Sequence, residues 1–171
     1  TDEGDCVYEE ITEYKRTRTL VEEKLEDYNM EPKCIPMDLA MFKDAIVHVC
    51  RIHRILMQPR GNIMLIGVGG SGRSSLCRLS SYIAGMVVFS IEITKNYRII
   101  EFREDIKKLY RTAGCEDKKV VFLFNDTQIK DELFLEDVNN ILSSGIVPNL
   151  FAKDELPEIF DAVRKAAVQA G

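Results

Sequence analysis

The stretch Gly67-Val68-Gly69-Gly70-Ser71-Gly72-Arg73-Ser74 decides the fold of this chain. It follows the apolar run Ile63-Met64-Leu65-Ile66, which predicts a buried strand, and it leads into Ser75-Leu76-Cys77-Arg78-Leu79, which predicts the start of a helix. A strand, a glycine-rich loop and a helix together form a phosphate cradle. The glycines let successive N–H groups turn inward, and the helix N-terminus adds partial positive charge. We therefore predict a phosphate-binding loop at residues 67–75.

The spacing of this loop matches G-x-x-x-x-G-K-[ST] with one departure, because Arg73 stands where the pattern has lysine. Ser74 keeps the hydroxyl that would bind Mg²⁺. A planar guanidinium is larger than an ammonium group and need not reach the phosphate oxygens in the same way. A glycine-rich turn that binds no ligand is the alternative interpretation.

Short apolar runs alternate with helical patterns along the chain. Strands are predicted at 63–66, 86–93 and 120–124, and helices at 8–28, 38–57, 72–84, 104–112 and 157–170. This alternation predicts an α/β fold, a parallel sheet flanked by helices. Ligands of such sheets bind at the carboxyl ends of the strands, which brings the loop after Ile66 and the residues after Phe124 together.

Two prolines, Pro32 and Pro36, interrupt the first helical pattern. Residues 1–35 are therefore predicted to be an N-terminal helical linker, and residues 36–171 the α/β domain. Asp38 is the predicted N-cap of the helix that follows. In the last helix, the side chains predicted to face inward are Ile159, Phe160 and Val163.

The third predicted strand ends in Asn125-Asp126, as in a Walker B motif. There, one acid orients Mg²⁺ and its water, and the next positions the water that attacks the γ-phosphate. Asn125 is neutral and can act on the metal only through a bound water, while Asp126 stands at the catalytic position. We therefore expect nucleotide binding with slow or absent hydrolysis. Alternatively, Asp126 merely caps the next helix.

The bulk composition excludes several classes of function. The chain has 171 residues and a net charge of −5, which argues against nucleic-acid binding because that needs a basic face. No apolar run reaches the roughly 18 residues of a membrane span. The five cysteines are scattered and form no C-x-x-C, which favours a reducing, cytoplasmic compartment and no zinc site.

Further motifs accompany the loop. They lie at 36–39, 51–56, 122–129, 134–142 and 145–151. Together with residues 67–74 they resemble the fourth AAA+ module of dynein heavy chains, the axonemal kind more than the cytoplasmic. The resemblance implies a P-loop NTPase of AAA+ type, incomplete at its C-terminal end. The strand with the sensor-1 residue, one further strand and the helical lid are missing, so we expect these residues to be part of a longer chain.

The resemblance also implies a function. Dynein heavy chains are ATP-driven, minus-end-directed microtubule motors with a ring of six AAA+ modules, of which the fourth binds ATP or ADP with Mg²⁺ and is regulatory. By motif position, Gly67 to Ser75 would hold the phosphates, Ser74 and Asn125 would serve the metal, and Asp126 would be the catalytic acid. Pro36, Met37 and Leu39 would lie on the adenine side.

The implied partners are the neighbouring AAA+ modules of the same heavy chain, other dynein chains, and microtubules through the whole motor rather than directly. The implied location is the axonemal cytoskeleton of a cilium or flagellum. Two alternatives stay open. One is a structural ring module that binds no nucleotide, and the other is a different P-loop enzyme such as a small-molecule kinase.

Overall fold

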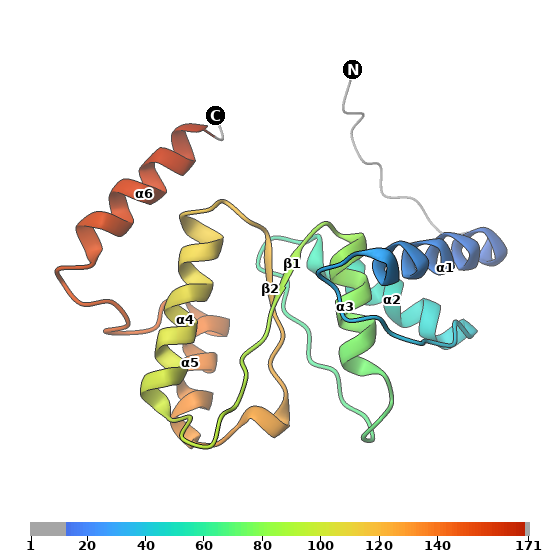
Figure 1. Ribbon diagram of the computed structural model, residues 1–171, viewed down its shortest axis with the longest axis horizontal. Coiled ribbons are helices and arrows are strands. Elements are labelled where there is room, and N and C mark those ends of the chain that lie inside the picture. Colours follow the sequence, from blue (N-terminus) through green and yellow to red (C-terminus); the bar gives the residue numbers. More distant parts are fainter. Residues whose placement is uncertain (1–12, 170–171) are drawn as a thin grey trace.

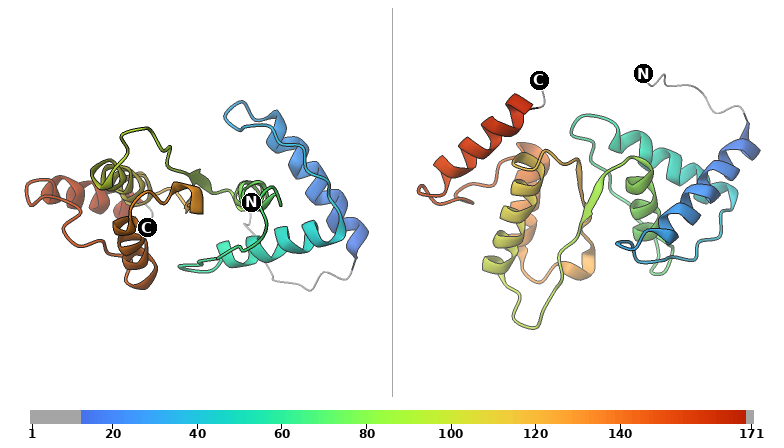
Figure 2. Two further views of the ribbon diagram at one scale, coloured as in Figure 1. Left: turned by 90° about the horizontal axis from the view of Figure 1, so that it is seen from below. Right: turned by 45° about the horizontal axis from the view of Figure 1, so that its top comes forward.

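The computed structural model describes residues 13–169. The helices are α1 Tyr14–Met30, α2 Lys43–Leu56, α3 Arg73–Ile83, α4 Ile99–Gly114, α5 Glu132–Ser143 and α6 Leu156–Gln169, with a short 3-10 helix η1 at Asp126–Gln128; the strands are β1 Val87–Phe89 and β2 Val120–Phe122. The two strands lie between two groups of helices (Figure 1), and the turned views agree (Figure 2). Helices α1, α2 and α3 pack on one another, and α4 packs on α5 and α6.

The two strands form a parallel pair in which Val87 lies opposite Val120 and Phe89 opposite Phe122. Helix α4 lies between them in the sequence, so strand, helix and strand form the crossover unit that parallel pairing requires. The predicted parallel α/β arrangement is confirmed. Both strands are shorter than the predicted ranges 86–93 and 120–124, because interstrand pairing ends at Phe89 and Phe122.

The prediction of a buried strand at 63–66 is wrong. In the part of the chain that the structure describes, this segment is assigned to no strand, and β1 and β2 pair only with each other. Met64 and Ile66 are 84% and 85% exposed, while Ile63 and Leu65 pack against the buried residues of the first helix group. The side chains therefore alternate as in a strand with one covered face, but the segment lacks a hydrogen-bonded neighbour.

Several predicted helix boundaries need correction. Asp38 caps no helix, because α2 begins at Lys43 with Phe42 as its N-cap. Helix α4 begins at Ile99, earlier than predicted, where the Glu101 carboxylate accepts the Arg98 N–H at 2.9 Å. Helix α5 was not among the predicted helices, although Asp131 caps it by accepting the Leu133 N–H at 3.0 Å.

The helices predicted at 72–84 and 157–170 are confirmed as α3 and α6 to within a residue. In α6, however, Phe160 is 62% exposed, so it is not the inward residue that was predicted. Val163 is 38% exposed but faces α4 as predicted, because a Cβ placed on Gly114 would lie 3.6 Å from Val163 Cγ2. Helix α6 packs on the end of α4. This contact covers only a narrow stripe of the α6 surface. Of the helix predicted at 8–28, residues 8–12 lie outside the described range.

Each group of helices has its own core. Around α1 to α3 the buried residues include Ile46, Val49, Ile52 and Leu79; around α4 and α5 they include Phe102, Ile106 and Phe134. The rings of Phe102 and Phe134 stack with centroids 4.4 Å apart, and neither is exposed. Beside them Arg103 forms a two-pronged ion pair with the buried Asp137, at 2.9 and 3.1 Å. The stacked rings and this ion pair hold α4 against α5.

The segment before α6 is attached to α4 through the Glu155 carboxylate. Its oxygens accept from Lys107 Nζ and Arg111 Nη2, both at 3.0 Å, and from the Ala152 N–H at 2.9 Å. The Ala152 N–H, followed by Lys107, lowers the pKa of Glu155. Because the pKa is lower in the folded state, this carboxylate contributes stability at neutral pH that is lost as the pH falls.

Replacing Phe134 tests the α4–α5 core. Phe134→Ala removes one ring of the buried stack, and we expect it to lower the free energy of unfolding by about 3–5 kcal/mol. Leu135→Ala is the matched control, because Leu135 is 45% exposed on the same helix, and it should cost at most about 1 kcal/mol. Urea unfolding followed by circular dichroism measures both. Equal losses would show that the stack is not a principal contact.

Replacing Glu155 tests the attachment before α6. Glu155→Gln should lower the thermal midpoint Tm at pH 7, where the wild-type carboxylate is charged. The difference from wild type should begin to shrink as the pH falls below about 4.5, the ordinary pKa of a glutamate. It should vanish only after the pH has also fallen through the lowered pKa of the folded state, because the carboxylate is then protonated in both folded and unfolded chains. Scanning calorimetry between pH 3 and 7 measures it. Glu158→Gln, an exposed acid on α6, is the control, and a pH-independent difference for Glu155→Gln would contradict the assignment.

Candidate nucleotide-binding site

The loop at 67–72 turns sharply into α3 through two glycines in the left-handed region. Gly70 has a φ of 77° and Gly72, the N-cap of α3, a φ of 75°, a backbone conformation that favours glycine over residues with a Cβ. The first bond of the helix runs from the Leu76 N–H to the Gly72 carbonyl at 2.9 Å. The N–H groups of residues 73–75 precede that bond and point out of the helix end. The loop therefore offers donors to an anion.

The base of the loop is closely packed around Gly67. A Cβ placed there would lie 3.3 Å from Ser71 Oγ and 3.6 Å from Arg73 Cδ, and the Ser71 N–H donates to the Val68 carbonyl at 3.4 Å. Residues 71–73 therefore lie close to residues 67–68, at the start of the loop just after the exposed Ile66. A methyl group at position 67 would require the Ser71 side chain to move by a few tenths of an ångström.

The Arg73 side chain folds back across the same loop. Its guanidinium donates from Nη1 to the Leu65 carbonyl at 3.5 Å and from Nη2 to the Val68 carbonyl at 3.3 Å. The planar fork of an arginine can reach two acceptors in this way, whereas the point charge of a lysine is less suited to it. Arg73 therefore links the end of segment 63–66 to the tip of the loop.

The loop meets the end of the second strand at Asn125. Ser74 Oγ lies 3.4 Å from Asn125 Oδ1, although the two residues are 51 positions apart. Figure 1 shows the loop before α3 and the segment after β2 at the same end of the strands. The prediction that these segments meet is confirmed.

Gln128, which the sequence interpretation did not select, holds Asn125 in place. Its Oε1 accepts the Asn125 N–H at 2.7 Å, and its Nε2 donates to the Ile91 carbonyl at 2.6 Å. The side chain thereby ties the segment after β2 to the segment after β1. The spacing of three residues from Asn125 to Gln128 is that of a capping box and is the signal that could have identified it.

Asp126 is exposed and opens η1. Among the described residues its carboxylate accepts one hydrogen bond, from the Thr127 N–H at 3.0 Å. The structure therefore brings Asn125 rather than Asp126 to Ser74. The alternative that Asp126 caps the next helix is wrong, because Asn125 is the N-cap of η1 and Asp131 is the N-cap of α5. The catalytic role of Asp126 stays a prediction.

On the other side of the loop, segment 36–39 lies beside the start of α3. A Cβ built on Gly72 would lie 3.7 Å from Leu39 Cδ2. Pro36 is exposed, and Met37 and Leu39 are half-buried. The backbone of Met37 is held by Asn29 of α1, another residue that sequence reasoning missed. No local spacing connects Asn29 with Met37, so no sequence signal identifies this contact.

The residue types at this site fit a magnesium nucleotide. The loop N–H groups, the serine hydroxyls and the Arg73 cation suit phosphate oxygens. Ser74 and Asn125 offer neutral oxygens, which Mg²⁺ accepts beside phosphate and water. Within residues 13–169 no group of three or more His, Cys, Asp or Glu could hold a metal ion by itself.

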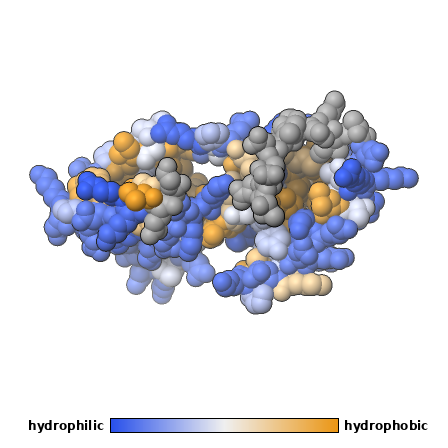
Figure 3. Space-filling model, turned by 90° about the horizontal axis from the view of Figure 1, so that it is seen from above, coloured by the Kyte–Doolittle hydropathy of each residue, from blue (hydrophilic) through white to orange (hydrophobic). Residues whose placement is uncertain are grey.

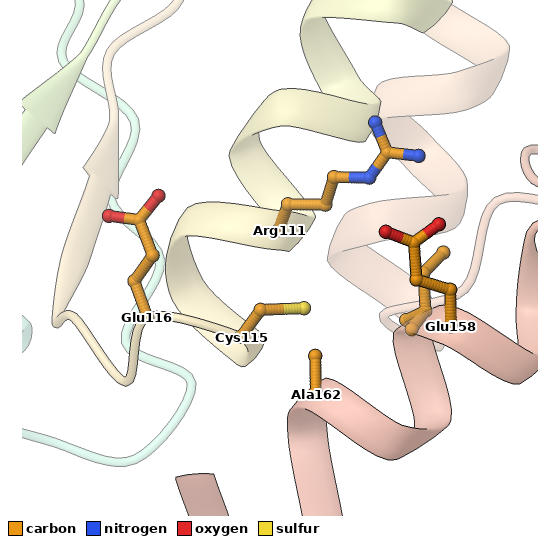
Figure 4. A pocket seen from close by; sticks show the side chains of 6 residues that line it. Arg111, Cys115, Glu116, Glu158 and Ala162 are labelled. Carbon is orange, nitrogen blue, oxygen red and sulfur yellow. The ribbon is translucent and has the colours of Figure 1, made fainter. Parts of the chain in front are cut away.

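Two surface hollows lie away from the loop. One, of about 170 Å³, lies between the end of α4 and α6 and is lined by Arg111, Cys115, Glu116, Glu158 and Ala162, among others (Figure 4). The other, of about 610 Å³, lies beside β1 and α4. Neither includes a residue of 67–75. Residues 67–71 of the loop are themselves exposed. The face seen from above is largely hydrophilic with separate hydrophobic areas (Figure 3).

None of the helices within the described range combines the length and hydropathy that crossing a membrane requires.

Comparisons with known proteins agree with this geometry. Residues 37–171 match the family described as P-loop containing dynein motor region D4. Over 165 residues, 96% of this chain, the sequence is 60% identical to the dynein-1-beta heavy chain of the flagellar inner arm I1 complex of Chlamydomonas reinhardtii. It is 56% identical over 90% of the chain to human dynein axonemal heavy chain 2, and 48% identical over 99% to human dynein axonemal heavy chain 6.

The chain spans about 4% of the length of each of these relatives. All three are heavy chains of axonemal or flagellar dyneins, and the matched region contains the loop, α3 and the Asn125 segment described above. The chain belongs to the family of the P-loop containing dynein motor region D4, within the axonemal dynein heavy chains.

Proposed function

We propose that this chain binds a magnesium nucleotide, ATP or ADP, at residues 67–75, as a regulatory module of an axonemal dynein heavy chain. The observation that carries the proposal is the approach of Ser74 to Asn125 at 3.4 Å. It joins the helix after a glycine-rich loop to the end of a parallel strand, where nucleotides bind in such sheets.

In this proposal each part of the site has one role. The N–H groups from Gly67 to Ser75 hold the phosphates, and Ser74 together with Asn125, through water, serves the metal. Pro36, Met37 and Leu39 form the apolar side that faces adenine. When bound, Mg²⁺ neutralises charge on the phosphate oxygens.

The same residues explain why we expect slow or absent hydrolysis. Arg73 donates to the Leu65 and Val68 carbonyls, at 3.5 and 3.3 Å, which leaves fewer of its donors for the β- and γ-phosphates. Asn125 carries no charge. The Asp126 carboxylate accepts the Thr127 N–H, and reorienting it toward a water would break that bond. These features weaken turnover more than binding.

At the level of the whole protein, we propose part of an ATP-driven, minus-end-directed microtubule motor of the ciliary or flagellar axoneme. The match to region D4 supports a place as the fourth AAA+ module of the ring. The partners would be the neighbouring modules of the same heavy chain and other dynein chains. Microtubules would be contacted by the motor as a whole.

A structural module that binds no nucleotide is the second candidate. The observation that favours it is that the Arg73 guanidinium donates hydrogen bonds to the Leu65 and Val68 carbonyls of the loop and the segment before it. In that case the hydrogen bonds of Arg73 would replace those that phosphate makes in a working site. The following two substitutions distinguish the candidates.

Gly72→Asp should abolish binding, because it places a carboxylate where phosphate is held. We expect affinity for Mg·ADP to fall about a hundredfold or more. The titration is followed by hydrogen exchange of the peptides covering residues 67–76 in the intact motor, which separates this site from others. Gly85→Asp is the matched control, since Gly85 has a similar φ of 66° at the other end of α3. No protection in wild type would favour the structural module. Unchanged protection in Gly72→Asp would contradict the placing of phosphate at Gly72.

Arg73→Lys should strengthen binding of Mg·ATP, by about tenfold, because an ammonium group releases the loop carbonyls and can approach the phosphates. The same exchange titration measures it, with Arg78→Lys on α3 as the control. If Arg73→Lys leaves the affinity unchanged, Arg73 is not what limits the site.

A further inference from the structure

Asn29, in the last turn of α1, forms hydrogen bonds with both the N–H and the carbonyl of Met37. Its Nδ2 donates to the Met37 carbonyl at 3.0 Å, and its Oδ1 accepts the Met37 N–H at 2.8 Å. The carboxamide thus satisfies the peptide groups of Met37 as a neighbouring strand would. Both contacts are partly buried, and a residue with only a donor or only an acceptor cannot make both.

The helix that carries Asn29 is itself firmly placed. The preceding residue, Tyr28, is 5% exposed, and its ring packs edge-to-face on Tyr82 of α3 with centroids 5.4 Å apart. Helix α3 is the helix that begins at the phosphate loop. Asn29 is therefore anchored to the same body as the loop, through a contact at the opposite end of α3.

The segment that Asn29 holds reaches the loop two residues later. Leu39 lies beside Gly72, where a Cβ would be 3.7 Å from Leu39 Cδ2. Segment 36–39 is not part of a helix or strand. Asn29 therefore supplies both of the side-chain hydrogen bonds that the structure gives the Met37 peptide groups, and these hold an irregular segment next to the loop.

We infer that Asn29 is a positioning residue for the nucleotide base. It holds segment 36–39 at a set distance from the loop, so it acts on the affinity for the base and leaves the phosphate cradle unchanged. The inference rests on the proposed nucleotide site. It gives α1 an effect, through segment 36–39, on how tightly the site binds a ligand that has a base.

The test compares a ligand with a base and one without. In the intact heavy-chain motor, hydrogen exchange of peptides covering residues 67–76 is titrated with Mg·ADP and with Mg·pyrophosphate. In Asn29→Ala we expect affinity for ADP to fall about five- to tenfold, the effect of losing hydrogen bonds of this kind, while affinity for pyrophosphate changes less than about twofold. The Met37 amide should also exchange faster without ligand.

Two further variants sharpen the result. Asn29→Asp keeps an oxygen for the Met37 N–H but places a second, charged oxygen against the Met37 carbonyl, which lies 3.0 Å from the donor that this oxygen replaces. The two acceptors repel each other, so the ADP affinity of Asn29→Asp should fall at least as far as that of Asn29→Ala. Asn139→Ala, an exposed asparagine on α5, should change neither affinity. Equal losses for ADP and pyrophosphate, or none for either, would overturn the role of Asn29 while leaving the nucleotide site standing. No protection in wild type would overturn both.

Discussion

The left-handed backbone at Gly72 is the constraint on which the rest of the site depends. With a φ of 75°, Gly72 turns the chain from the loop directly into α3 and serves as the N-cap of that helix. Helix α3 is locked in place by Leu79, which is fully buried, and by the packing of α1 and α2 on it. The direction of the helix then places Ser74 beside Asn125 and leaves the loop donors facing solvent.

The charges at the site are arranged for holding an anion more than for cleaving one. Arginine and backbone N–H groups surround the loop, but the groups nearest Ser74 are neutral amide and hydroxyl oxygens. Hydrogen bonds from the protein itself already occupy the Arg73 guanidinium and the Asp126 carboxylate.

Much of this could be predicted from local patterns. The glycine spacing predicts the loop and the start of α3, and a polar residue at the end of an apolar run predicts that Asn125 lies near the loop. The patterns failed where long-range partners decide the outcome. The run at 63–66 has the pattern of a buried strand but pairs with no strand among residues 13–169. Phe160 was predicted to face inward, but the contact of α6 with the end of α4 leaves this side chain exposed.

The glycine loop, the helix after it and the alternation of strands and helices follow from local sequence alone, because they depend on φ preferences and hydrophobic periods within a few residues. Only the tertiary structure decided that Arg73 folds onto Leu65 and Val68, that Gln128 ties Asn125 to Ile91, and that Asn29 holds Met37. These contacts depend on side-chain direction and on helices docked through their cores. No local pattern encodes such an arrangement, because the partners meet only after the core has formed.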